Sequence, residues 1–111
     1  MAKFAVAILL LALTMPASAE DMDSANFILP GCKGYRGEGS PHAWMRGRCV
    51  GFIDGLWYGV GGRDFCPPRE VTSGQAVAVV VKYIEARPER MHEDFGKLAI
   101  EALTAAWPCK R

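Results

Sequence analysis

The sequence predicts a small all-α domain of four helices stapled by two disulfides. Apolar residues recur with the helical period of 3.6 over most of the chain. An even number of cysteines, four, follows an N-terminal segment that is typical of exported proteins. The chain has 111 residues, and we expect residues 20–111 to form one domain.

The first 19 residues are typical of a secretory signal peptide. Lys3 precedes the apolar run FAVAILLLALTM, and the small residues Ala17 and Ala19 flank a cleavage site. A membrane-spanning helix needs about 20 apolar residues, and this run ends earlier, at Pro16. We therefore expect cleavage after Ala19, a periplasmic location and no membrane attachment of the remaining chain.

The charge balance argues against nucleic acid as a partner. Removal of Lys3 from the 13 Lys and Arg residues leaves 12, which equals the 12 Asp and Glu residues. A chain without net charge has no overall field to attract nucleic acid or an anionic membrane.

The segment DSANFILPGCKGY predicts a short first helix, capped at Asp23 or Ser24. Pro30 and Gly31 are poor residues for a helix interior, so we expect an interruption there.

A second helix, from about residue 43 to residue 60, carries a glycine at every fourth position. At 100° per residue, its core-facing arc contains Met45, Cys49, Phe52, Ile53, Leu56 and Val60. The neighbouring flank holds Trp44, Arg48, Tyr58 and the glycines Gly47, Gly51, Gly55 and Gly59. A row without side chains is a groove that can receive another helix at close range.

Three interpretations of this glycine row are open. The groove can hold another helix of the same chain. It can instead be an interface with a second copy or a partner, with Trp44 and Tyr58 as aromatic anchors. The third alternative is a strand, because Val50, Phe52, Trp57 and Tyr58 suit strands.

The third helix is expected from about residue 73 to residue 86. Thr72 and Gln75 form a capping box, and Val71 precedes them as a hydrophobic staple. Its apolar stripe is Val77, Val80, Val81 and Ile84.

After the turn ARPER, Pro88 suits the first turn of a last helix that ends at Trp107 before Pro108. This helix would place His92 in its first turn and pair Glu93 with Lys97. Its apolar stripe is Met91, Phe95, Leu98, Ala102 and Ala106.

The last two helices form an antiparallel hairpin in this interpretation, which predicts the disulfides. Cys66 lies just before the hairpin and Cys109 just after it, so the two should pair, leaving Cys32 to pair with Cys49. A metal site is the weaker alternative, because the chain has neither CxxC nor HxxxH spacing.

The chain contains no catalytic constellation that spacing alone would reveal. His42 and His92 are isolated, no carboxylate pair stands out, and GVGG at residues 59–62 is not followed by the GK[ST] of a phosphate loop. We therefore expect a binding protein without enzymatic activity, cofactor or metal.

Four blocks of sequence resemble the Rap/Tai family of type VI secretion immunity proteins. They are SANFILPGCK, GRCVGFIDGLWYG, CPPREVTSGQAVAVVVKYIEARPERMH and ALTAAWPC, which together span residues 24–109. The specific parts are the block with Cys66, Pro67, Thr72 and Gln75 and the terminal Trp107, Pro108 and Cys109.

The resemblance implies an all-helical periplasmic protein, commonly a homodimer, that blocks a peptidoglycan amidase injected by a neighbouring cell. The alternative is a toxin-independent periplasmic stress protein of the holdase type. As contact surfaces we expect the two loops Gly37 to Trp44 and Ala86 to Met91. The candidate contact residues are His42, Trp44, Arg87, Pro88, Glu89 and Arg90.

Overall fold

The computed structural model describes residues 21–39 and 42–110. The predicted signal peptide lies outside the described residues. Four α-helices follow one another, with a short 3₁₀ turn before the last: α2 (Ala25–Tyr35), α3 (Ala43–Val60), α4 (Ser73–Glu85), η1 (Pro88–Arg90) and α5 (Phe95–Ala106). Between residues 21 and 110, the described segments contain isolated β-bridges but no strand. The predicted four-helix, all-α fold is confirmed.

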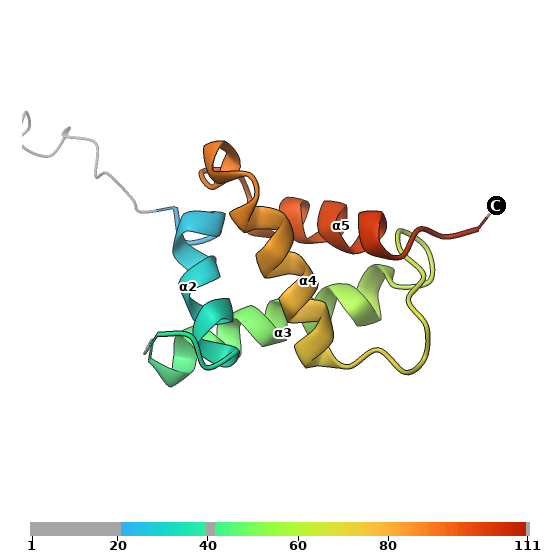
Figure 1. Cartoon of the computed structure of the whole chain (residues 1–111), viewed down its shortest axis with the longest axis horizontal. Coiled ribbons are helices and arrows are strands. Elements are labelled where there is room, and N and C mark those ends of the chain that lie inside the picture. Colours follow the sequence, from blue (N-terminus) through green and yellow to red (C-terminus); the bar gives the residue numbers. More distant parts are fainter. Residues whose placement is uncertain (1–20, 40–41, 111) are drawn as a thin grey trace, which may run out of the picture.

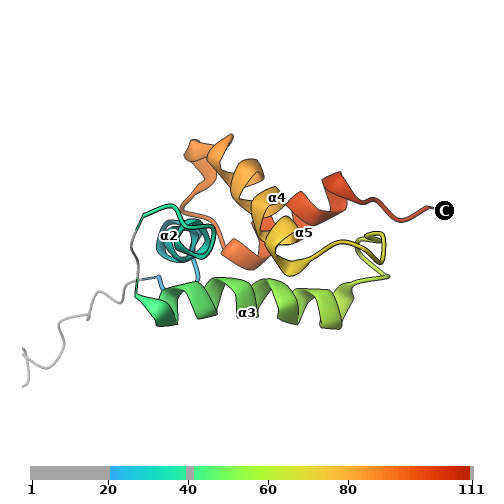
Figure 2. The same cartoon turned by 60° about the horizontal axis from the view of Figure 1, so that its bottom comes forward.

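The helices form two layers. In Figure 2, α3 runs along the bottom of the molecule, α2 crosses its N-terminal part, and α4 and α5 lie over the rest. All four helices contribute buried apolar side chains to one core, and Phe65 joins it from the loop between α3 and α4. None of the described helices is both long and apolar enough to cross a membrane.

Helix α2 is continuous, so the interruption expected at Pro30 and Gly31 is wrong. The Ser24 hydroxyl caps the helix by accepting a hydrogen bond from the Phe27 N–H. Pro30 lies on the solvent side, and a Cβ at Gly31 would overlap the backbone carbonyl of Met45. Gly31 therefore allows α2 to approach α3 closely, and this packing offsets the poor helix propensity of both residues.

Helix α3 buries the predicted apolar arc. Cys49 and Ile53 are fully buried, and Phe52, Leu56 and Val60 are partly buried against the core. The glycine face, which we define as Gly47, Gly51, Gly55 and Gly59, points away from the core, and all four residues are exposed. No atom lies within 4 Å of the place that a Cβ would take at any of them.

Two of the three interpretations of the glycine row are therefore wrong. The segment is helical, which rules out the strand. No other helix of the described chain lies against the glycine face, because α2, α4 and α5 all pack on the opposite, apolar side of α3. The interface with a second copy or a partner stays a prediction.

Helix α4 begins at the predicted N-cap, with the Thr72 hydroxyl accepting from the Gln75 N–H at 3.2 Å. Its predicted apolar stripe is buried. Helix α5 begins at Phe95, later than the expected start at Pro88, and Asp94 caps it by accepting from the Lys97 N–H at 2.9 Å.

The late start of α5 has a tertiary cause. The first N–H groups of α2 lack partners within their own helix. The Asn26 N–H donates to the Met91 carbonyl at 2.8 Å, and the Ala25 N–H donates to the Glu93 carbonyl at 3.0 Å. The segment before α5 thus caps α2 instead of forming helix, and His92 lies in this segment and not in the first turn of α5 as expected.

Both predicted disulfides are present. Cys32 bonds to Cys49 and ties α2 to α3, and Cys66 bonds to Cys109 and ties the two outer ends of the α4–α5 hairpin. In Figures 1 and 2 the hairpin helices cross at a wide angle rather than lying alongside each other over their full length.

Candidate partner-binding surface

The turn between α4 and α5 projects from the body of the molecule. We define the α4–α5 turn as residues 86–91, which include η1; it is the orange segment above α4 in Figure 1. Pro88 and Glu89 at its tip are exposed, whereas Arg87 and Arg90 are partly buried. Of the four candidate contact residues in this turn, Pro88 and Glu89 therefore face solvent, whereas Arg87 and Arg90 pack partly against the protein.

Arg90 braces the turn from inside. Its Nε donates to Glu93 Oε2 at 2.6 Å, and its Nη1 donates to Glu101 Oε2 at 2.8 Å. Its Nη2 donates to the second carboxylate oxygen, Oε1, of both Glu93 and Glu101. The Tyr83 hydroxyl donates to the same Glu101 carboxylate at 3.1 Å. Because these hydrogen bonds hold its guanidinium within the turn, Arg90 is a positioning residue in this structure and not an outward contact residue, which is the role that we expected.

This network shifts the pKa values of both carboxylates. Hydrogen bonds from Arg90 and then from Lys97 lower the pKa of Glu93 to about 2. The hydrogen bond from Arg90 also lowers the pKa of Glu101, with a smaller contribution from Tyr83. The predicted pair between Glu93 and Lys97 is confirmed at 3.0 Å. The network links the turn to the connection before α5 and to α5 itself.

Arg87 is held by Tyr83. Its Nη1 donates to the Tyr83 carbonyl at 2.9 Å, and its guanidinium carbon lies 3.6 Å from the centroid of the Tyr83 ring. Stacking of a guanidinium on an aromatic face fixes the side chain without neutralising its charge. Among the described residues, Arg87 has no carboxylate partner.

His42 and Trp44 lie elsewhere. His42 precedes α3 and Trp44 is in its first turn; both are exposed, and Trp44 packs against Phe27 with ring centroids 6.1 Å apart. In both ribbon views the N-terminus of α3 lies apart from the α4–α5 turn. The described residues of the expected loop Gly37 to Trp44 therefore do not join the α4–α5 turn in one site, and residues 40 and 41 of that loop lie outside the described residues.

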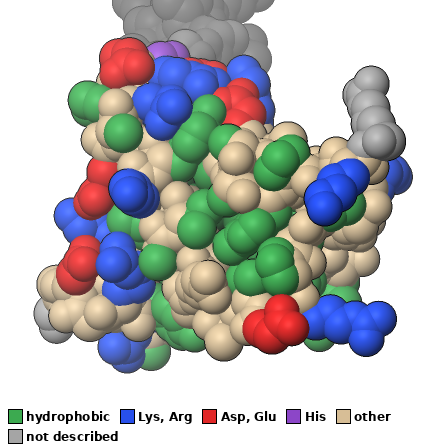
Figure 3. Space-filling model, turned by 45° about the vertical axis from the view of Figure 1, so that its right-hand side comes forward, with side chains coloured by type: hydrophobic (Ala, Val, Ile, Leu, Met, Phe, Trp, Pro, Cys, Tyr) green, Lys and Arg blue, Asp and Glu red, His purple; other side chains and the backbone are tan. Residues whose placement is uncertain are grey.

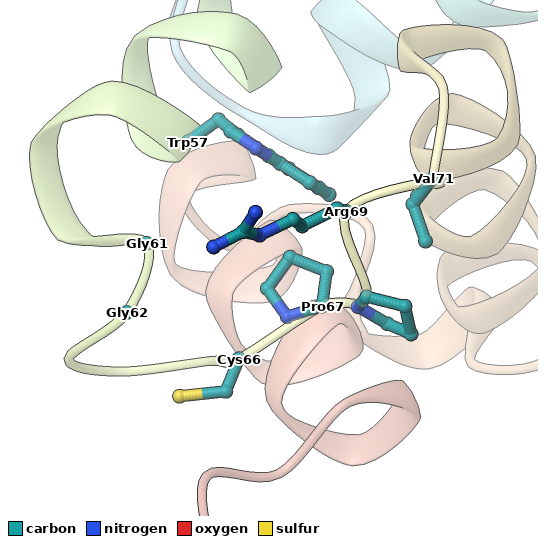
Figure 4. A pocket seen from close by; sticks show the side chains of 8 residues that line it. Trp57, Gly61, Gly62, Cys66, Pro67, Arg69 and Val71 are labelled. Carbon is teal, nitrogen blue, oxygen red and sulfur yellow. The ribbon is translucent and has the colours of Figure 1, made fainter.

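A pocket of about 410 Å³ was not foreseen from the sequence (Figure 4). In this view the Arg69 side chain extends between those of Trp57 and Pro67 and points toward the Gly61 and Gly62 turn. The Cys-Pro-Pro block was the signal for it, because consecutive prolines beside a disulfide make a rigid wall. Its lining residues are Trp57, Gly61, Gly62, Cys66, Pro67, Pro68, Arg69 and Val71.

Across residues 21–39 and 42–110 we find no cluster of three or more His, Cys, Asp or Glu residues that could hold a metal ion. Besides this pocket, the surface features described above are a braced, projecting turn and exposed faces of helices. Such features suit contact with another macromolecule, since rigid elements lose little entropy on binding.

Comparison with known proteins gives the chain its family. No curated protein matches it in a sequence search. A model of the Rap1a immunity proteins matches residues 24–109, from the cap of α2 to the last cysteine. The match covers all four helices and both disulfides, and the chain therefore belongs to the Rap1a immunity protein family.

Proposed function

We propose that this chain is a periplasmic immunity protein that binds a type VI-secreted peptidoglycan amidase and occludes its active site. The observation that carries the proposal is the family match over residues 24–109. In this proposal the chain acts by binding alone, with no catalytic step of its own.

The disulfides support a periplasmic location. All four cysteines are paired, and disulfides persist in oxidising compartments outside the cytoplasm. The N-terminal sequence agrees, because it is typical of an export signal.

The α4–α5 turn is the proposed plug. An inhibitor that fills a cleft needs a protruding element whose conformation is set before binding, because ordering a loose loop costs affinity. Pro88 restricts the backbone at the tip, Arg90 anchors the base through Glu93 and Glu101, and the side chains of Pro88 and Glu89 are exposed. Pro88 and Glu89 would enter the cleft, with Arg87 at its edge.

The other predicted contact surfaces belong to this proposal as well. We propose that the glycine face of α3 packs against a second copy of the chain, since Tyr58 (90% exposed) and Trp44 (54%) lie on the same flank as large exposed anchors. His42 and Trp44 would then contact either that copy or the toxin.

The test uses the purified chain from residue 20 onward and a peptidoglycan amidase identified among the genes next to this one. We expect a stable complex and loss of peptidoglycan hydrolysis when the two are mixed. Glu89→Lys, at the tip of the turn, should weaken inhibition, whereas Glu70→Lys makes the same charge change in the exposed loop before α4 and should not.

If a verified neighbouring amidase is neither bound nor inhibited, the immunity proposal is wrong. A toxin-independent role in the envelope, of the holdase type, would then replace it. Equal inhibition by Glu89→Lys and Glu70→Lys, with binding intact, would reject only the turn as the plug.

A further inference from the structure

A second surface adjoins the α4–α5 turn. The α4–α5 groove is a hollow of about 410 Å³ between the outer sides of α4 and α5. Val79 and Tyr83 of α4 form one side, and Ala105 and Ala106 of α5 lie opposite. Figure 3 shows a band of hydrophobic side chains across the face that these two helices form.

The alanines leave space that larger side chains could fill. Ala105 and Ala106 are exposed and end at Cβ, so the groove is mainly apolar but is not closed by the chain itself. If a partner placed apolar side chains in the groove, the apolar surfaces of the groove and of the partner would both leave water. Removing apolar surface from water is the main favourable term in most protein association.

The charged side chains that line the groove are both positive. Lys82 and Arg87 line it, and no Asp or Glu does. Six other Lys or Arg side chains form ion pairs, which are those of Lys33, Arg36, Arg48, Arg63, Arg90 and Lys97. Within the described part of the chain, neither Lys82 nor Arg87 has such a partner.

These charges argue against a second copy as the occupant. A two-fold contact would place the same patch against itself and bring the Lys82 and Arg87 side chains of both copies together. Like charges across an interface oppose association, whereas carboxylates on a different partner would pair with both cations.

We infer that the α4–α5 groove is a further contact with the toxin, and that it receives a toxin segment in which Asp or Glu residues flank apolar side chains. The inference rests on the proposed function. Arg87 belongs to both the turn and the groove, so a toxin whose cleft holds the turn would lie against the groove as well. Tyr83 holds the Arg87 guanidinium in place before binding.

The experiment measures the affinity of the neighbouring amidase for three groove variants by calorimetry. Ala105→Gln adds bulk without charge, and Ala105→Glu adds similar bulk with a negative charge. Lys82→Glu reverses a groove charge, with Arg46→Glu on exposed α3 as its matched control. All substituted residues are exposed, so the melting temperature should stay near that of the original chain.

We expect Lys82→Glu and Ala105→Glu each to weaken binding about 10-fold or more, as charge reversal at a contact centre does. Ala105→Gln should weaken it less than Ala105→Glu, and Arg46→Glu should leave it unchanged. The affinity of the original chain should fall with added NaCl, and Lys82→Glu should reduce that dependence, because salt screens charge pairs.

Three outcomes overturn the inference in distinguishable ways. If the original chain binds the amidase and the groove variants bind equally well, the groove inference is wrong and the proposed function stands. If the original chain does not bind, both are wrong. Loss of self-association in Ala105→Glu, seen by sedimentation with toxin binding intact, would assign the groove to a second copy and reject the inference.

Discussion

The two disulfides differ in their surroundings: one is buried between two helices, and the other joins two segments at the surface. Cys32 and Cys49 are fully buried where α2 crosses α3, beside the close contact of Gly31 with Met45. Cys66 is exposed and joins the loop before α4 to the tail after α5. The first disulfide is therefore part of the packed core, whereas the second mainly restrains two chain ends at the surface.

The largest expected effect comes from removing each disulfide by paired Cys→Ala substitution. The loop-entropy relation gives about 3 kcal/mol for the Cys32–Cys49 separation of 17 residues and about 4 kcal/mol for the Cys66–Cys109 separation of 43. Loss of two buried sulfurs should add about 1 kcal/mol each at the first site. We therefore expect chemical denaturation to show a loss of about 5 kcal/mol for Cys32/Cys49 and about 4 kcal/mol for Cys66/Cys109. If the Cys66/Cys109 variant loses more stability, the entropy of the unfolded chain alone determines how much each disulfide stabilises the fold.

A second comparison sets Gly31 against Gly51. Gly31→Ala forces a Cβ against the Met45 carbonyl and should destabilise the fold by about 2 to 3 kcal/mol. Gly51→Ala meets open space on α3 and should stabilise it by about 0.5 to 1 kcal/mol, since alanine favours helix. Thermal unfolding of both variants measures the difference. Equal melting temperatures would contradict the close approach of α2 to α3.

The glycine face offers a test of assembly with a small effect on the fold. Gly55→Leu places a side chain in open space, so the stability of the monomer should change by less than about 0.5 kcal/mol. If the face is a dimer seam, sedimentation should show folded monomers at concentrations where the original chain is dimeric. If Gly55→Leu assembles like the original chain, the glycine face is not a dimer interface.

The smallest expected effect is the acid response of the Arg90 network. Glu93 has a pKa of about 2 in the fold against an ordinary 4.5, so between these values the unfolded chain binds more protons than the folded chain. The stabilisation is complete above about pH 4.5 and is lost as the pH falls toward 2. Glu101 acts in the same direction.

Arg90→Gln should reduce this acid sensitivity, because the carboxylates lose the partner that lowers their pKa values. Urea unfolding between pH 7 and pH 3 would measure it, with Arg46→Gln on α3 as the control. An unchanged pH slope in Arg90→Gln would show that the network is not formed in solution.

Local sequence patterns determined much of the fold. The N-cap at Thr72 and the apolar stripe of α4 depend on residues within a few positions of one another, and both were predicted correctly. The pairing of Cys66 with Cys109 was predicted from the hairpin, and in the structure the loop before α4 brings Cys66 to the chain end after α5. The family resemblance was likewise readable from short blocks along the chain.

Other features depended on groups far away in the sequence. The start of α5 is set by α2, because the first N–H groups of α2 donate hydrogen bonds to the carbonyls of Met91 and Glu93. The continuity of α2 through Gly31 is set by its contact with α3, and the availability of Arg90 is set by Glu101 on another helix. By itself, the sequence determined the number of helices, the apolar sides of α3 and α4 and how the cysteines pair. It placed the start of the last helix too early, and two residues of that helix's predicted apolar stripe do not fit: Met91 lies before α5 and Ala106 is exposed. Only the tertiary structure decided which termini cap one another and which side chains remain free, because a hydrogen bond or close contact needs a partner whose position no local pattern specifies.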